Sequence, residues 1–475
     1  MEIISLLFSL LFILPIAGGG QLILLYSGSK AQLKPLEING PTFAEVNETI
    51  SFIVTSEGLP VKDATVLFAG YEKKTDDRGI ATFQVDFTGS FKVTAEKEGF
   101  KANSTLLWVF PKGNKKLPLR GFMAGAEQVG NTFTAFRMAG ANFVFIKVYY
   151  LYDEDGNIYP GIVTHGFQKV PKELQREELG EQIRLARAWG LKVLLIADAE
   201  PLPGVRGPPP QFTADEAKEK FLKQAREEAF SLAEFAEKWN IDILMPMLGL
   251  VGYPSEAFSI YKEILPELRK RFSGKLASFA FEVEEIANGK FLHYNHEFNY
   301  SGLDLITPLF AIDLFTDSKS ELEKAIDKAL DFGVYLKDKY KVLLVPIVLS
   351  DFNLFGGNYS IYQKFFEKFN NHEEAKNWLT ELIIKKSLER SVDGIFIYCT
   401  HFLGMPLLPH GKWENLHPYW QSRRTLDIAR EYFILPFNEE GESALAAIRY
   451  ASLLGNRVIN ETSNSALLNW MENKI

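Results

Sequence analysis

The chain has 475 residues, of which 47% are hydrophobic and 24% are charged, so it can build large cores and is not a disordered protein. The formal net charge of −8 argues against general affinity for nucleic acid, because phosphate binding requires a basic surface. The single cysteine, Cys399, excludes an internal disulfide and a thiolate metal cluster. It lies in an apolar run, where a packed thiol is expected rather than a nucleophile.

The chain begins with an apolar segment. Residues 3–26 carry no charge and are mostly Leu, Ile and Phe, which suffices for a membrane span of roughly 20 residues. We expect an uncleaved membrane anchor within residues 1–30, with a removed secretory signal as the alternative. The protein is then expected to contact a membrane through this segment and to be extracytoplasmic, either anchored or secreted. Five Asn-x-Ser/Thr sequons agree with export, namely those at Asn47, Asn103, Asn299, Asn358 and Asn460.

Residues 35–110 have a different pattern. Short alternating runs such as Ile50–Val54, Ala81–Val85 and Phe91–Ala95 are separated by turn clusters such as Glu57–Pro60. This spacing predicts a small all-β sandwich. Residues 58–93, in which an Ala-x-Val strand precedes an Asp-Gly type of hairpin, resemble the immunoglobulin-like modules of surface proteins. The resemblance implies that this part acts as a spacer.

After residue 119 the sequence changes to eight short apolar runs, each followed by a stretch with helical periodicity. Such runs are typical of parallel strands buried on both faces. Eight of them within about 280 residues predict a (β/α)8 (TIM) barrel over residues 117–436. Residues 437–475 are expected to form a short helical C-terminal extension. The eight runs are Gly121–Ala126, Asn142–Tyr149, Lys192–Ala197, Asp242–Leu248, Leu276–Phe281, Asp304–Ile312, Lys341–Leu349 and Asp393–Cys399.

The residues that follow these runs are the candidates for chemistry, because a barrel carries its active site where the strands end. Acids and aromatic side chains are frequent there. Carboxylates accept hydrogen bonds from sugar hydroxyls, and glycosidic hydrolysis requires one protonated and one ionised carboxyl group. Any single acid of this kind could equally be solvated or bind loop amides. The candidates are Glu127, Asp198, Glu200, Glu256, Glu282, Asp313, Asp351 and His401, with Tyr149, Tyr150, Tyr253, Tyr294, Trp413 and Trp420 as aromatic neighbours.

Metal and cofactor chemistry is not expected. His293, His296 and Glu297 are close in sequence, but they fall in a stretch predicted to be a loop, and no His-x-His follows the first run. No glycine-rich loop precedes a helix in the way that phosphate binding requires. We therefore predict neither a metal nor a cofactor.

Residues 119–433 resemble the clan A glycoside hydrolases, in particular the β-mannanase-like branch. In that clan a Glu just after the fourth strand, usually preceded by Asn, is the acid/base, and a Glu ending the seventh strand is the nucleophile. Here Leu248 and Gly249 occupy the first place, and the seventh run ends in Ser350 and Asp351. The resemblance is carried by Gly140–Val144, Ala186–Leu194, Leu265–Leu276, Val392–Phe396 and His417–Trp420.

Two main hypotheses follow. In the first, the protein is a divergent glycosidase in which Glu256 is the general acid/base and Asp351 is the nucleophile or base, while the other rim candidates, with Trp413, bind substrate. In the second, the catalytic pair has been lost, and the barrel is a carbohydrate-binding or structural cell-surface protein. A third alternative is another barrel enzyme built on Asp198, Glu200 and Glu282. The distances between rim carboxyl groups discriminate the first hypothesis from the second.

Overall fold

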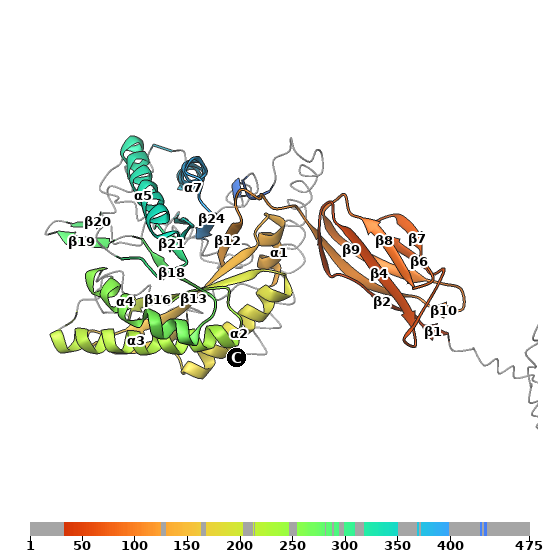
Figure 1. The fold of residues 1–475 in the computed structure, drawn as a ribbon, viewed down its shortest axis with the longest axis horizontal. Helices are drawn as coiled ribbons and strands as arrows, with labels where there is room; N and C mark the ends of the chain where they lie inside the picture. The colour runs from red at the N-terminus through yellow and green to blue at the C-terminus, as the bar shows by residue number, and fades with distance from the viewer. Residues whose placement is uncertain are drawn as a thin grey trace, which may run out of the picture. The chain divides into compact units, whose positions relative to one another are not determined.

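The computed structural model describes residues 33–124, 130–162, 168–202, 212, 214–246, 254–280, 282–286, 289–293, 299–308, 318–349, 368–369, 372–398, 428–429 and 432–434. The chain divides into two compact units (Figure 1). The first unit includes the described residues up to Leu107, except Phe43–Glu48 and Val85–Ser90. These two segments belong with the second unit, which contains the rest of the chain from Trp108.

The N-terminal part of the chain is rich in β-structure. The inward side chains of its two larger sheets meet in an aromatic core, where Phe68 lies 6.5 Å from Phe52 and 5.5 Å from Phe83 between ring centroids. The immunoglobulin-like classification stays a prediction. One sheet contains β2 (Glu37–Asn39), β4 (Thr49–Ser56), β5 (Leu59–Pro60) and β8 (Ile80–Gln84), the other has the order β3 (Phe43–Glu45), β11 (Asn103–Phe110), β9 (Gly89–Glu96), β6 (Thr65–Phe68) and β7 (Tyr71–Lys74), and β1 (Lys34–Pro35) pairs with β10 (Phe100–Lys101).

The second unit is built on a curled parallel sheet of nine strands, consistent with a (β/α)8 barrel (Figure 1). All the pairings along the path of this sheet are parallel. The strand order is β22 (Leu343–Leu344), β21 (Leu305–Thr307), β18 (Lys275–Phe279), β17 (Ile243–Met245), β16 (Lys192–Pro201), β13 (Phe143–Tyr152), β12 (Leu119–Ala124), β24 (Gly394–Tyr398) and β23 (Ile347–Leu349).

The two outermost strands of this order, β22 and β23, are consecutive in the chain and separated only by Val345 and Pro346. The Val345 amide donates to the Ile306 carbonyl of β21 (3.0 Å), and the Phe396 amide of β24 donates to the Pro346 carbonyl (2.9 Å). Residues 343–349 therefore act as one strand with hydrogen bonds on both sides. The sheet thus closes on itself, since a proline without an amide hydrogen can still accept in the ladder.

Helices connect most of the strands, as the alternating pattern predicts. The fifth connection is different: the two-stranded hairpin of β19 (Glu282–Ile286) and β20 (Gly289–His293) follows β18, so the helix expected after the fifth run is not found among the described residues there. The helices are α1 (Gly130–Met138), α2 (Lys172–Ala188), α3 (Asp215–Lys238), α4 (Pro254–Arg271), α5 (Lys319–Tyr340) and α7 (His372–Glu389), and the short strands β14 (Ile158–Ile162) and β15 (Gln168–Lys169) extend the sheet beside β13.

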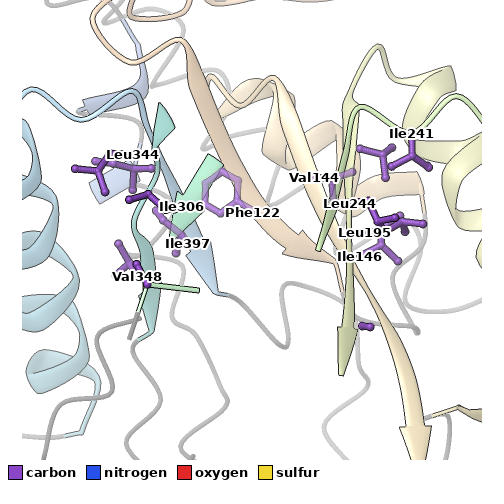
Figure 2. Packing of buried hydrophobic residues seen from close by; sticks show 14 of the residues in the cluster. Phe122, Val144, Ile146, Leu195, Ile241, Leu244, Ile306, Leu344, Val348 and Ile397 are labelled. Atoms are coloured by element: carbon purple, nitrogen blue, oxygen red, sulfur yellow. The ribbon is translucent and has the colours of Figure 1, made fainter. Parts of the chain in front are cut away.

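The strands of the barrel sort their side chains into two separate cores. Because successive side chains of a strand point to opposite faces, alternate residues enter different clusters. In β13, Val144 and Ile146 join the outer core beneath the helices, whereas Phe143 and Phe145 join the inner core. Figure 2 shows part of the outer core, in which Phe122, Val144, Ile146, Leu195, Ile241, Leu244, Ile306, Leu344, Val348 and Ile397 are labelled.

A repeated polar contact fixes the N-terminal ends of the strands. The residue just before every second strand of the barrel is Asp or Asn, and its side chain accepts the backbone amide of the neighbouring strand. Such bonds satisfy amides that the parallel ladder leaves unpaired. Three of the acceptors also pair with a cation from the end of a helix, as Asp304 does with Arg269. The contacts are Asn142 with Arg120 (2.9 Å), Asp242 with Val193, Asp304 with Leu276 and Asp393 with Leu344 (2.8 Å each).

The segment that enters the barrel is bonded to its last described helical residues. The Asn114 amide donates to the Phe433 carbonyl (2.7 Å), and the Asn114 side chain donates to the Tyr432 carbonyl (3.0 Å). Gly113 forms an isolated β-bridge with Ile434. This entry segment therefore joins the structure of the second unit.

The predicted apolar anchor (residues 1–30) and C-terminal extension (residues 437–475) lie outside the described residues. None of the helices in the described part of the chain has both the length and the apolar character needed to cross a bilayer.

Removing one of the strand-end acceptors tests this part of the fold. Asp304→Ala should lower the free energy of unfolding by about 1–3 kcal/mol, because the Leu276 amide loses its acceptor and Arg269 loses its ion-pair partner. Asp304→Asn, which keeps one acceptor oxygen, should cost less. The exposed Asp338→Ala on α5 is the control and should change stability by no more than about 0.5 kcal/mol. Equal stability of Asp304→Ala and the control in urea denaturation would contradict the assignment.

Candidate functional site

The parallel strands bring their C-terminal ends to one rim, where a barrel of this type carries its chemistry. The rim is uneven, because β13 and β16 have 10 residues each and pair along their full length, whereas β17 and β21 have three. Beyond Lys147, β13 also pairs with the antiparallel β14. The ends of β13 and β16 are therefore the best-defined part of the rim.

An ion pair lies at the inner side of these two strands. Lys147 follows Phe143 and Phe145 at two-residue steps, and Asp198 follows Leu194 and Ile196 in the same way, so both continue the inner rows. The Lys147 ammonium donates a short hydrogen bond to Asp198 Oδ2. Only 6% of the lysine side chain and 11% of the aspartate side chain are exposed.

A buried ion pair of this kind is costly to form. Removing two charges from water is expensive, and their attraction restores that cost only with good geometry. An apolar pair of the same volume would often stabilise the barrel equally well. The position of this pair at the rim, above an apolar inner core, therefore points to a role other than stability.

The two tyrosines after Lys147 have different surroundings. Tyr149 is half-buried, is the register partner of Asp198, and has its ring centroid 5.4 Å from the Lys147 ammonium. Tyr150 points the opposite way into the outer core, where its hydroxyl accepts a hydrogen bond from Arg176 (3.1 Å). Burial raises the pKa of Tyr150 above its ordinary value. The expectation that both tyrosines neighbour the rim acids is therefore wrong for Tyr150.

A further polar side chain continues an inner row at the end of β21. Thr307 follows the inner-core residue Leu305 by two positions and is fully buried. Among the described residues its hydroxyl has no hydrogen-bond partner. The inner side of the rim therefore carries polar groups from at least three strands.

The other predicted site residues are placed less completely. Glu200 lies near the end of β16, Glu256 lies in the first turn of α4, and Glu282 opens β19 opposite His293. The structure describes the backbone of these acids and not their side chains. Glu282 thus belongs to the hairpin that follows the fifth barrel strand. Glu127, Asp313, Asp351, His401 and Trp413 lie outside the described residues.

Among the predicted acids, Asp198 is the one whose side chain the structure describes, and its partner Lys147 was not predicted. Lys147 is the single charged residue in the apolar run from Phe143 to Tyr152. Its spacing from Phe143 and Phe145 could have indicated an inward position. The described residues contain no group of three or more His, Cys, Asp or Glu side chains placed to hold a metal ion.

Known structures similar to this chain are glycoside hydrolases, whereas no family model and no curated protein matches it. A GH113 β-1,4-mannanase is 14% identical, with 72% of this chain and 98% of that chain covered and a TM-score of 0.41. A GH113 β-mannanase from Alicyclobacillus acidocaldarius is 11% identical, with 71% of this chain and 97% of that chain covered and a TM-score of 0.39. A glycoside hydrolase family 5 mannosidase from Rhizomucor miehei is 9% identical, with 73% of this chain and 99% of that chain covered and a TM-score of 0.40. Similarities this distant assign neither a family nor an activity.

Separating the two charges tests the burial of the ion pair. Lys147→Met should lower the free energy of unfolding by about 3–5 kcal/mol, because the Asp198 carboxylate is left buried without its cation. The double variant Lys147→Met/Asp198→Leu should recover most of that loss. The exposed Lys192→Met at the opposite end of β16 is the matched control. If guanidinium denaturation shows Lys147→Met to be as stable as this control, the pair is not buried.

Proposed function

We propose that the protein acts on a polysaccharide or oligosaccharide at the C-terminal face of its parallel sheet. The observation that carries the proposal is Asp198, a carboxylate fixed by Lys147 at the inner side of the rim beside the half-buried Tyr149. A carboxylate next to an aromatic ring supplies the two kinds of contact that a sugar unit requires. The closed parallel sheet supports the same face as the place of chemistry.

In the proposed reaction Glu256 is the general acid/base and Asp351 is the nucleophile or base. One protonated carboxyl group donates to the leaving glycosidic oxygen, while the ionised one attacks the sugar or activates water. A separation of about 5 Å between the two carboxyl groups would give retention, and one of about 6.5–9.5 Å would give inversion through a bound water. The start of α4 supports the role of Glu256, because it follows the fourth strand of the barrel.

The second candidate function is binding without hydrolysis. Leu248 and Gly249 occupy the place where the resemblance implies the acid/base, and Asp351 is shorter than the implied glutamate by one methylene group. In addition, Lys147 holds Asp198 in an ion pair, which places this acid to accept hydrogen bonds from a ligand. A carbohydrate-binding or structural cell-surface protein would retain Asp198 and dispense with the catalytic pair.

Assays of the full chain on oligomers of β-mannan, β-glucan and chitin discriminate these functions. Glu256→Gln and Asp351→Asn should each reduce kcat/KM by about 100-fold or more, because each removes a group that transfers a proton or attacks the sugar. Glu263→Gln, an exposed position on the same helix as Glu256, should be unaffected. Binding without turnover would select the second function. Turnover that both substitutions leave unchanged would refute the assignment of the pair.

We also propose that the protein is extracytoplasmic, with the β-rich N-terminal part as a spacer of the immunoglobulin-like type between a membrane anchor and the barrel. The apolar residues 3–26 and the sequons support this, and the sequon residues Asn103 and Asn299 are exposed in the structure. Mass spectrometry of the mature N-terminus should find residues 1–30 retained, and protease added to intact cells should degrade the barrel. A barrel that is protected until the cells are lysed would contradict the proposed location.

A further inference from the structure

We propose that the ends of β13 and β16 form a subsite for a neutral hexose unit, in which Tyr149 is the ring platform, Asp198 accepts from hydroxyl groups, and Lys147 is a positioning residue for Asp198. The proposal rests on the proposed function and specifies the substrate class of the same face.

The first support is the placement of the two ligand-facing residues. Tyr149 and Asp198 are partners in the parallel register of β13 and β16, so their backbones are neighbours across one inter-strand step of about 4.8 Å. Both continue the inner rows of their strands. A ring and a carboxylate are thus held side by side on two long, fully paired strands, which fixes their spacing better than loops would.

The second support is that the two residues of the ion pair have different roles, Lys147 as the donor and Asp198 as the acceptor. Lys147 donates to Oδ2 of Asp198, and the Oδ1 oxygen is not part of that bond. The lysine side chain is 6% exposed and the aspartate side chain 11%. The aspartate is thus, by fraction, the slightly more exposed partner of the pair. The lysine orients the carboxylate, which presents an acceptor to a hydroxyl group.

The third support is the environment of the Tyr149 ring. Its centroid lies 5.4 Å from the Lys147 ammonium, and the residue is half-buried, so the cation holds the ring while part of its surface stays exposed. The Tyr149 carbonyl accepts a hydrogen bond from Gln175 of α2 (2.5 Å), which fixes the backbone at the same residue. The lysine of the same strand therefore holds the ring, and α2 holds the backbone that carries it.

This arrangement determines which sugars fit. A neutral hexose offers hydroxyl donors to Asp198 and an apolar face to Tyr149. A uronic acid would place a second carboxylate beside Asp198, and like charges at such a distance are unfavourable. Asp198→Asn removes that repulsion and leaves the Lys147 ammonium as the remaining charge. The wild type should thus prefer neutral oligosaccharides, and this one variant should lose that preference.

Calorimetric binding of the full chain to neutral oligomers of β-mannan, β-glucan and chitin, and to an oligogalacturonate, tests the proposal. Asp198→Asn should weaken binding of the preferred neutral oligomer about 10- to 100-fold, the loss expected for a hydrogen bond to a charged group. Its affinity for oligogalacturonate should rise about tenfold. Tyr149→Leu should weaken neutral binding about fivefold, and Tyr149→Phe should bind as the wild type does.

The double variant Lys147→Met/Asp198→Leu separates a binding role from a structural one. It should fold with a stability close to that of the wild type and still bind neutral oligomers about 10- to 100-fold more weakly. Recovery of binding together with stability would overturn the subsite and leave the pair purely structural. Lys192→Met is the control in every series and should bind as the wild type does.

Different experimental results would contradict the subsite and the proposed function. If the wild type binds and cleaves an oligosaccharide, but Asp198→Asn and the double variant bind it normally, the subsite is wrong and the proposed function stands. If the wild type binds no oligosaccharide of the panel, the proposed function and the subsite fail together.

Discussion

The closure of the parallel sheet through residues 343–349 is the constraint on which the site depends. This segment has hydrogen bonds to β21 on one side and to β24 on the other, across a proline that accepts without donating. In a closed sheet each strand has one face toward the helices and one toward the axis. A two-residue step along a strand therefore stays on the same side, and the inner rows continue toward the rim with Lys147 and Asp198.

The charged residues at the two ends of the barrel differ in their partners and in their burial. At the N-terminal end, carboxylates such as Asp304 accept a backbone amide and pair with a cation from a helix end, and both partners are about one-third exposed. These contacts satisfy backbone groups and fix the order of strands. At the C-terminal end, Lys147 and Asp198 are nearly buried and bond to each other. This contrast agrees with a general property of such barrels: residues at the N-terminal face contribute to stability, and residues at the C-terminal face carry the chemistry.

The sequence predicted the alternation of parallel strands and helices in the second unit, but not which side chains the strands bring together. The apolar runs predicted the strands because a strand buried on both faces leaves a continuous apolar signal. The hairpin after β18 was not predicted, because residues Glu282–Ile286 are few and mostly charged and do not alternate strictly. Neither the inward position of Lys147 nor the outward position of Tyr150 was predicted. Both positions follow from the two-residue periodicity of the strand, counted from Phe143.

The relation between Glu256 and Asp351 could not be predicted from sequence. In the sequence both follow runs that are predicted to be strands, and the geometry of connections depends on tertiary contacts rather than on local pattern. The Asp and Asn residues before alternate strands were visible at the start of the runs. Their role required the partner strand, however, because each side chain bonds an amide that lies 22 to 49 residues away in the chain.

Hydrogen–deuterium exchange of the full chain, with and without a bound neutral oligosaccharide, tests most directly whether the C-terminal face of this barrel receives a sugar. The account predicts that the sugar slows exchange at residues 147–152 and 198–202 and leaves residues 192–194, at the opposite end of β16, unchanged. Protection confined to the N-terminal ends of the strands, or to the β-rich N-terminal part, would contradict it.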